Sequence, residues 1–375
     1  MAGIVDVHGH ITHPDLFKRF PMPPSLLDIE GMLDRKSELG IDTTIVGSPV
    51  GFGTMMPVPG LDNYAQPLDQ LARFHDWLAS EVDTYHPRLA AYVYVNPLGG
   101  ADELAQAART ARDGPFVGLI VNTSVNGRYL DGPEADDFFA MASDLAMPIL
   151  LHPPAEPVGS SSVGDFRIVE QVGRFLDVTM CVATLAFSGR LQEYPDLRFI
   201  GATAGGAIGL LGGRLDSAYA PSHYGGSPGG GPPGGGGGPP GGGGGPPGGG
   251  GGAPGGSGGA PGGSGGAPGG GGGPPGGGGG PPGGGPPIAR YANRITAPPS
   301  EFLRNVYVDT ANLSTPNQLA NIDTMGAERM LFGTDSPPLS TPLADCIAQI
   351  QALPISEADR DKILGGNARE LFELN

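Results

Sequence analysis

Apolar residues gather along the chain in short runs of strand length, and most of the runs precede a longer segment with apolar residues at helical spacing. Eight runs are predicted as strands: 4–10, 43–49, 89–97, 116–123, 148–154, 198–206, 305–312 and 330–337. Helices are predicted at 26–39, 68–85, 101–113, 134–146, 166–194, 208–219 and 356–371. This alternation indicates parallel strands with crossover helices, so the prediction is an α/β protein with a (β/α)8 TIM barrel.

An open, doubly wound sheet is the rival architecture. No GxGxxG follows the first strand, where the phosphate loop of such a sheet would lie. A barrel makes a further prediction, because its reactive side chains gather at the carboxyl ends of the strands. The polar residues described below obey that rule.

One long segment interrupts the pattern. Residues 225–287 are almost wholly Gly and Pro, with no aliphatic side chain suited to a core. We predict a disordered, low-complexity insertion there, leaving the barrel on the face opposite the active site. Residues 1–224 and 288–375 then form a single barrel domain.

Charge and hydropathy exclude several classes of partner. The formal net charge is −17, from 21 basic and 38 acidic residues, so nucleic acid is not an expected partner. No apolar stretch approaches the roughly 20 residues of a membrane span. The two cysteines, Cys181 and Cys346, lie far apart, and the first strand starts without a leader pattern, so a cytoplasmic protein is expected.

Four metal-type ligands fall at the ends of predicted strands. His8 and His10 are two residues apart on the first strand, so both imidazoles should point to the same side. His152 ends the fifth predicted strand and Asp335 ends the eighth. Three imidazoles and a carboxylate suit one divalent cation, Zn²⁺ first, with Mn²⁺, Fe²⁺ or Co²⁺ as alternatives.

These residues sit in segments that resemble the amidohydrolase superfamily. IVDVHGH, FVGLIVNT, YLDGPEADDFFAMASDLAMPILLHPP, YPDLRFIGATAGG, PPSEFLRNVYVDTAN and LFGTDSP are similar to amidohydrolase-related proteins of the aminocarboxymuconate-semialdehyde and γ-resorcylate decarboxylase type. The likeness covers nearly the whole chain except the Gly/Pro segment. One superfamily branch bridges two metals through a lysine on the fourth strand, but this chain has only Lys18, Lys36 and Lys362, so one ion is expected.

The resemblance also exposes a departure. Similar enzymes carry a histidine after the sixth strand that handles the proton of the metal-bound water, whereas this chain has Thr203 there. A threonine hydroxyl orients water but is no base near neutral pH. Three interpretations stay open: Asp335 accepts the proton, His223 or His13 swings in from a loop, or the site binds without turnover.

Several further residues are candidates for substrate contact. In similar decarboxylases an arginine at the position of Arg214 reaches across a dimer to the substrate carboxylate, which also implies a homodimer. Arg128 follows the fourth strand, and Asn122 and Asn312 end the fourth and seventh strands. Each of these has a plain structural alternative, such as a solvated surface arginine or a polar residue packed at the barrel top.

The leading hypothesis is therefore a metal-dependent decarboxylase, or related carbon–carbon lyase, acting on a small unsaturated or aromatic carboxylate through one metal-bound water. Hydrolysis of an ester, lactone or amide is the first alternative, with Asp335 as proton acceptor. A barrel that binds without catalysing is the second, because Thr203 replaces the usual histidine.

Overall fold

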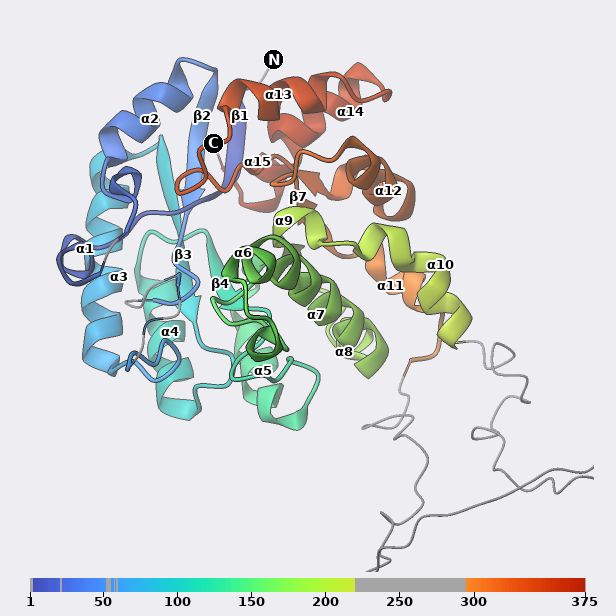
Figure 1. Cartoon of the computed structure of the whole chain (residues 1–375), viewed down its shortest axis with the longest axis horizontal. Coiled ribbons are helices and arrows are strands. Elements are labelled where there is room, and N and C mark those ends of the chain that lie inside the picture. Colours follow the sequence, from blue (N-terminus) through green and yellow to red (C-terminus); the bar gives the residue numbers. More distant parts are fainter. Residues whose placement is uncertain are drawn as a thin grey trace, which may run out of the picture.

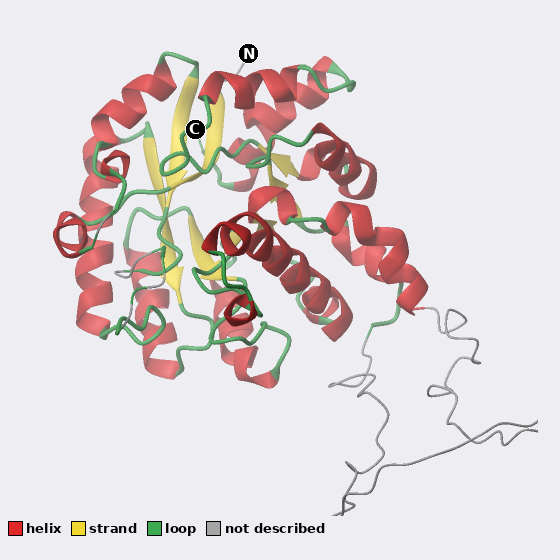
Figure 2. Ribbon diagram, viewed as in Figure 1, coloured by secondary structure: helices red, strands yellow, loops and turns green. Residues whose placement is uncertain are grey.

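Eight parallel strands form the centre of the molecule, ringed by helices (Figures 1 and 2). The computed structural model describes residues 3–219 and 295–374, apart from 21, 52–54, 57 and 59. The strands are β1 (Ile4–Gly9), β2 (Ile41–Val46), β3 (Leu89–Val95), β4 (Gly118–Asn122), β5 (Ile149–His152), β6 (Phe199–Gly201), β7 (Tyr307–Asp309) and β8 (Met330–Leu331). They pair in sequence order from β1 to β8, which confirms the predicted TIM barrel.

The helices cover the outside of these strands. They are α1 (Pro14–Arg19), α2 (Ile29–Ser37), α3 (Leu68–Tyr85), α4 (Ala101–Asp113), α5 (Asp136–Leu145), α6 (Phe166–Ile168), α7 (Arg174–Ser188), α8 (Arg190–Glu193), α9 (Ala202–Gly205), α10 (Ile208–Tyr219), α11 (Pro299–Leu303), α12 (Thr315–Met325), α13 (Leu343–Gln351), α14 (Glu357–Asp361) and α15 (Asn367–Leu371). None of the helices within these described stretches is both long and apolar enough to cross a lipid bilayer.

Strand residues alternate between two apolar layers. On β4, Ile120 joins a cluster made mainly of side chains from the other strands, whereas Leu119 and Val121 pack with helix residues such as Phe138 and Leu185. The first cluster therefore fills the barrel interior and the second lies between strands and helices. Asn122 follows Ile120 by two residues, which places it on the interior side at the carboxyl end of β4.

The barrel closes through backbone hydrogen bonds between β1 and the loop that follows β8. Val7 N donates to Phe332 O at 2.9 Å, and Asp335 N donates to His8 O at 2.7 Å. The second bond joins two of the predicted metal ligands, so the seam of the barrel and the candidate site coincide.

Several predicted boundaries were wrong. All eight strands exist but are shorter than predicted. The strand expected at 330–337 has only two residues, because Phe332 and Thr334 are buried but lie in the loop that follows it. The helix predicted at 166–194 is divided into α6, a π-helical turn (Val169–Gly173), α7 and α8, with Gly189 at φ 86° between the last two. The proposed insertion at 225–287, its exit face and both domain boundaries beside it lie outside the described residues.

Candidate metal centre and active site

The first two ligands are oriented by hydrogen bonds on the side of each ring that faces away from the site. His8 Nδ1 lies 2.5 Å from Asp309 Oδ2, and His10 Nδ1 lies 2.8 Å from the Gly47 carbonyl oxygen. Because both partners are acceptors, each Nδ1 carries the hydrogen in the neutral ring and leaves the Nε2 lone pair free. Both imidazoles point to the same side of β1, as predicted for His8 and His10.

His152 completes a cluster of three imidazoles. Its Nδ1 donates to the Pro153 carbonyl oxygen at 2.9 Å. The ring centroids of His8, His10 and His152 are 4.9–5.1 Å apart, and the rings stand nearly perpendicular to one another. Such an arrangement is expected of histidines that point at a common centre rather than stack.

Asp335 reaches this cluster from a loop. It lies beyond the end of β8, at φ 54°, so the expectation that it ends the strand is corrected in detail. Its Oδ1 is 3.0 Å from His10 Nε2 and 3.6 Å from His8 Nε2. One ligand atom from each of the four residues lies within 4.8 Å of the other three.

The chemistry of these atoms fits a divalent cation. His8 Nε2, His10 Nε2 and Asp335 Oδ1 are buried and have no hydrogen-bond partner among the described residues. Unsatisfied buried polar atoms are costly, and a cation held by three imidazole nitrogens and one carboxylate oxygen would satisfy all three at once. These four residues are the ones that would hold it.

The pKa values indicate the same demand for positive charge. Burial lowers the pKa of His8, but the carboxylates of Asp335 and Asp309 outweigh burial and raise it to about 9. Burial opposes ionisation of Asp335, yet the histidines hold its pKa well below the usual range. Burial and the neighbouring imidazoles lower the pKa of His152. The pocket thus favours a cation beside an ionised carboxylate, and a metal would displace a proton.

A buried ion pair between Asp6 and Lys36 supports β1. Asp6 Oδ2 accepts from Lys36 Nζ at 2.7 Å and from Thr334 Oγ1 at 2.6 Å, while Asp6 Oδ1 accepts from the backbone N–H groups of His8 and Thr334 at 3.1 Å. The carboxylate therefore ties β1 to the loop that carries Asp335. Lys36 serves this pair.

Thr203 occupies a tight turn after β6. Thr203 and Ala204 have φ of 53° and 58°, and Gly205 and Gly206 follow at 66° and 61°, so four successive residues adopt left-handed backbone. Ala204 N donates to Asp309 Oδ1 at 2.7 Å, the carboxylate that also holds His8. A Cβ on Gly205 would lie 2.5 Å from Val308 Cγ1, which excludes any larger residue there.

These residues border a cavity of about 310 Å³. His152, Asp335 and Thr203 line it, as does Asn312 from beyond β7. Its size falls at the low end of the ~300–1,000 Å³ common for small-molecule sites. The cavity thus accommodates a small organic substrate next to the four metal-type ligands.

Two charged residues of the cavity lining, Glu170 and Arg174, escaped the sequence analysis. Both lie in the segment after His152, where α7 begins close to the carboxyl ends of the strands. The only available signal was their position at the start of the helix that follows a ligand-bearing strand, since a Glu and an Arg four residues apart usually mark a solvated helix face.

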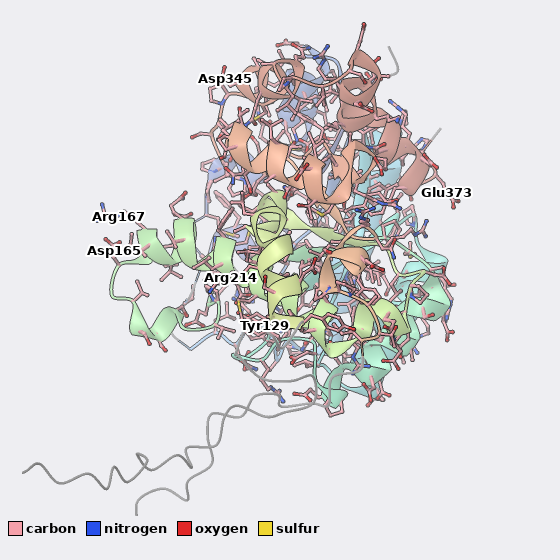
Figure 3. All side chains as sticks on the ribbon, turned by 90° about the vertical axis from the view of Figure 1, so that its right-hand side faces the viewer. Tyr129, Asp165, Arg167, Arg214, Asp345 and Glu373 are labelled. Carbon is pink, nitrogen blue, oxygen red and sulfur yellow. The ribbon has the colours of Figure 1, made fainter. Side chains whose placement is uncertain are left out.

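The other predicted residues are more dispersed. Asn122 is buried opposite His152 in the β4–β5 pairing, and both its amide atoms lack partners among the described residues. Arg128 lies 3.6 Å from Glu134 and outside the cavity lining. Arg214 is exposed on α10 (Figure 3) and does not belong to the cavity lining, while nearby Asp216 accepts from Ser300.

Of the two alternative histidines, His13 lies away from the site. His13 caps α1, where its side chain accepts from Asp15 N, and its ring lies 5.1 Å from that of Trp77. His13 is absent from the cavity lining. His223 lies outside the described residues.

Comparison with known proteins decides the family. A sequence profile described as amidohydrolase matches residues 5–223 and 271–374. The chain belongs to the amidohydrolase family. Two curated relatives of this amidohydrolase are a 2-amino-3-carboxymuconate-6-semialdehyde decarboxylase of Dictyostelium discoideum, 26% identical over 102 residues, and the decarboxylase orsB of Emericella nidulans, 29% identical over 139 residues. These matches cover 27% and 34% of the chain, and only 28% and 41% of the relatives.

Solved structures agree on the fold. The 5-carboxyvanillate decarboxylase LigW of Sphingomonas paucimobilis superposes with a TM-score of 0.69 at 18% identity, covering all of both chains. A 2,6-dihydroxybenzoate decarboxylase of Rhizobium gives 0.67 at 22%, covering 100% of this chain and 99% of that one. A dihydroxybenzoic acid decarboxylase of Polaromonas, solved with manganese and 2-nitroresorcinol, gives 0.67 at 20%, with 100% and 98% covered.

Proposed function

We propose that this amidohydrolase is a metal-dependent decarboxylase, or a closely related carbon–carbon lyase, of a small unsaturated or aromatic carboxylate. The observation that carries the proposal is the convergence of three imidazole Nε2 atoms and the Asp335 carboxylate beside a cavity of about 310 Å³. The decarboxylase names of the relatives support the choice of reaction.

The residues of the chain divide the work. A divalent cation at this site supplies electrostatic stabilisation of the substrate oxygens. His8, His10 and His152 would hold such a cation, because their rings are fixed by Asp309, Gly47 and Pro153. Burial of these side chains excludes bulk water, which strengthens the electrostatic interactions inside the site.

Asp335 is the proposed proton carrier. Its Oδ1 faces the ligand cluster, and the residue is one-fifth exposed toward the cavity. In the reaction the carbon–carboxylate bond breaks and CO₂ leaves. Asp335, ionised at rest, takes one proton from solvent and passes it to the carbon that keeps the electron pair. Thr203 lines the same cavity and orients substrate or water through its hydroxyl.

We propose one divalent ion, with Zn²⁺ as the first candidate because three nitrogens and one oxygen suit it. Mn²⁺ is the second, since manganese is bound in the Polaromonas relative. The two cysteines are unpaired and buried, which supports the further proposal of a cytoplasmic protein.

A homodimer is proposed from the helices that carry the cavity wall. Ile168, Val172, Leu176 and Met180 are each 45–49% exposed and recur every four residues from α6 into α7. On neighbouring α10, Leu210 is 62% exposed and Arg214 is exposed as well. A second copy seated on this stripe would bring Arg214 near the partner's cavity. Arg128 and Asn122 remain proposed substrate contacts within one chain.

Hydrolysis of an ester, lactone or amide is the second candidate. It is favoured by Thr203, since Asp335 is then the proton acceptor beside the ligand cluster. The non-catalytic alternative finds no support among the relatives, which are named as decarboxylases.

The test uses purified protein loaded with Zn²⁺ or Mn²⁺ and analysed for bound metal. CO₂ release is followed with hydroxybenzoates, including 2,6-dihydroxybenzoate and 5-carboxyvanillate, and acid release is followed with aryl esters and lactones. We expect about one metal per chain, CO₂ release by the wild type, and loss of both metal and activity in His10→Ala. Asp335→Asn should lose activity more completely than metal. Protein that takes up no metal, or that cleaves esters but no carboxylate, would refute the decarboxylase proposal.

A further inference from the structure

Arg174 brings a positive charge to the cavity from a different element than the metal ligands do. It is the first residue of α7 and directly follows the π-helical turn Val169–Gly173. That turn also contains Glu170, and both side chains line the cavity together with His152 and Asp335. Single π-helical turns occur often at functional sites, because the widened turn redirects the side chains around it.

The guanidinium of Arg174 is held in place, but not all of its N–H donors are used. Its Nη2 donates to the carbonyl oxygen of Met55, in the connection between β2 and α3, and its carbon lies 5.7 Å from the centre of the Phe166 ring. Its Nε is buried and has no partner among the described residues. An arginine offers five N–H donors in a rigid plane, so donors are left for a ligand.

Nearby carboxylates attract Arg174 without neutralising it. Burial lowers the pKa of Arg174, and the charges of Glu170 and Asp335 only partly oppose this shift. The side chain stays protonated at any working pH, because an arginine guanidinium does not lose its proton in proteins. Among the residues that the structure describes, no carboxylate forms an ion pair with it. A charged, partly desolvated guanidinium facing a cavity is a strong site for an anion.

The reacting carboxylate is a poor partner for such a group. Negative charge leaves that carboxylate as CO₂ forms, so a tight guanidinium contact there would stabilise the substrate more than the transition state. A second anionic group of the substrate keeps its charge throughout. Binding that group orients the substrate without opposing the reaction.

We propose that Arg174 recognises a second, non-reacting carboxylate of the substrate, so that the enzyme prefers dicarboxylates. The inference rests on the proposed function for the reaction, but the recognition itself is an equilibrium property. Arg174 acts within the same chain that holds the metal ligands, independently of Arg214 on the surface of α10.

The test measures binding to the metal-loaded protein by calorimetry. The probes are the three benzenedicarboxylates and their monoamides, in which one carboxylate is replaced by a neutral group of similar shape. We expect the wild type to bind at least one dicarboxylate more tightly than its monoamide. Arg174→Met should weaken that dicarboxylate by about 10- to 100-fold, as for loss of a charge-assisted hydrogen bond, and change the monoamide by less than about threefold.

Controls separate recognition from folding. Arg167→Met removes an exposed arginine of α6 that pairs with Asp165 on the outer surface (Figure 3), and it should bind like the wild type. Arg174→Lys keeps the charge and should retain part of the preference. Metal content and melting temperature are measured for each variant. A purely structural Arg174 would weaken both members of a probe pair equally.

The outcomes distinguish this inference from the proposed function. If Arg174→Met retains the preference, or the wild type shows none, the assignment of Arg174 is wrong whether or not the protein decarboxylates. If the preference depends on Arg174 but no carboxylate loses CO₂, decarboxylation is refuted and the binding role of Arg174 stands.

Discussion

Asp309 is predicted to control metal affinity although it would not touch the metal. Its carboxylate accepts from His8 Nδ1 at 2.5 Å, from Ala204 N at 2.7 Å and from Ala311 N at 3.0 Å. Asp309→Asn keeps the shape of the side chain but replaces one acceptor oxygen with an NH₂ group. Whichever way the amide turns, at least one N–H then faces another donor.

The magnitude follows from the two ways the amide can turn. If the NH₂ group faces His8, the ring loses the partner that fixes its tautomer, and if it faces Ala204, the left-handed turn after β6 is released. Changes of such outer partners usually weaken a metal site by about 10- to 100-fold. That corresponds to ~1.4–2.7 kcal/mol of binding free energy.

The assay is competition for Zn²⁺ or Mn²⁺ against a chelating dye at fixed pH. Asp177→Asn is the matched control, since Asp177 is also buried and accepts from Thr123, Ser124, Tyr129 and Val158, but contacts no metal ligand. We expect Asp177→Asn to lower stability and leave metal affinity within about twofold of wild type, by the same reasoning. Equal affinities for wild type and Asp309→Asn, or equal losses in both variants, would show that the Asp309 contact does not tune the site.

Three further predictions concern stability. Lys36→Met leaves Asp6 buried without its counter-ion and should lower the free energy of unfolding in urea by about 3–5 kcal/mol, whereas exposed Lys18→Met should change it by less than ~0.5 kcal/mol; equal effects would contradict the role of the pair. Burial lowers the pKa of His75 to about 4 from 6.5, so the unfolded chain binds a proton that the folded chain refuses. The free energy of unfolding should therefore fall by up to about 3 kcal/mol between pH 6.5 and 4, and His75→Gln should remove that part of its pH dependence. An unchanged pH dependence in His75→Gln would contradict this role of His75. Free metal at about 100 times its dissociation constant should stabilise the wild type by ~2.7 kcal/mol, a shift that chelation reverses and that His10→Ala lacks.

The sequence sufficed for the architecture because each strand and helix is encoded locally. The helices predicted at 68–85 and 101–113 are confirmed to the residue as α3 and α4. The predicted strand ends were less accurate, because at the carboxyl ends of the strands a residue can be buried without pairing in the sheet. Phe332 and Thr334 are buried, yet they bond to residue 363 and to Asp6 rather than continuing β8.

The candidate site was predictable only where residue type and strand position coincide. His8, His10, His152 and Asp335 stand at or just beyond strand ends, so the barrel rule brought them together. The supporting contacts join distant parts of the chain, as His8 and Asp309 do across 301 positions. Arg174 was missed because its direction depends on a π-helical turn, which no periodicity of the sequence reveals.

The hydrogen bond from Asp335 N to His8 O places the closing seam of the barrel inside the metal site. During synthesis the two histidines of β1 emerge first, and Asp335 follows only after seven more strands have left the ribosome. The complete set of four ligands therefore exists only once the last β/α unit has docked against the first. Tight metal retention by a ribosome-bound nascent chain would mark the moment at which the barrel becomes a ring.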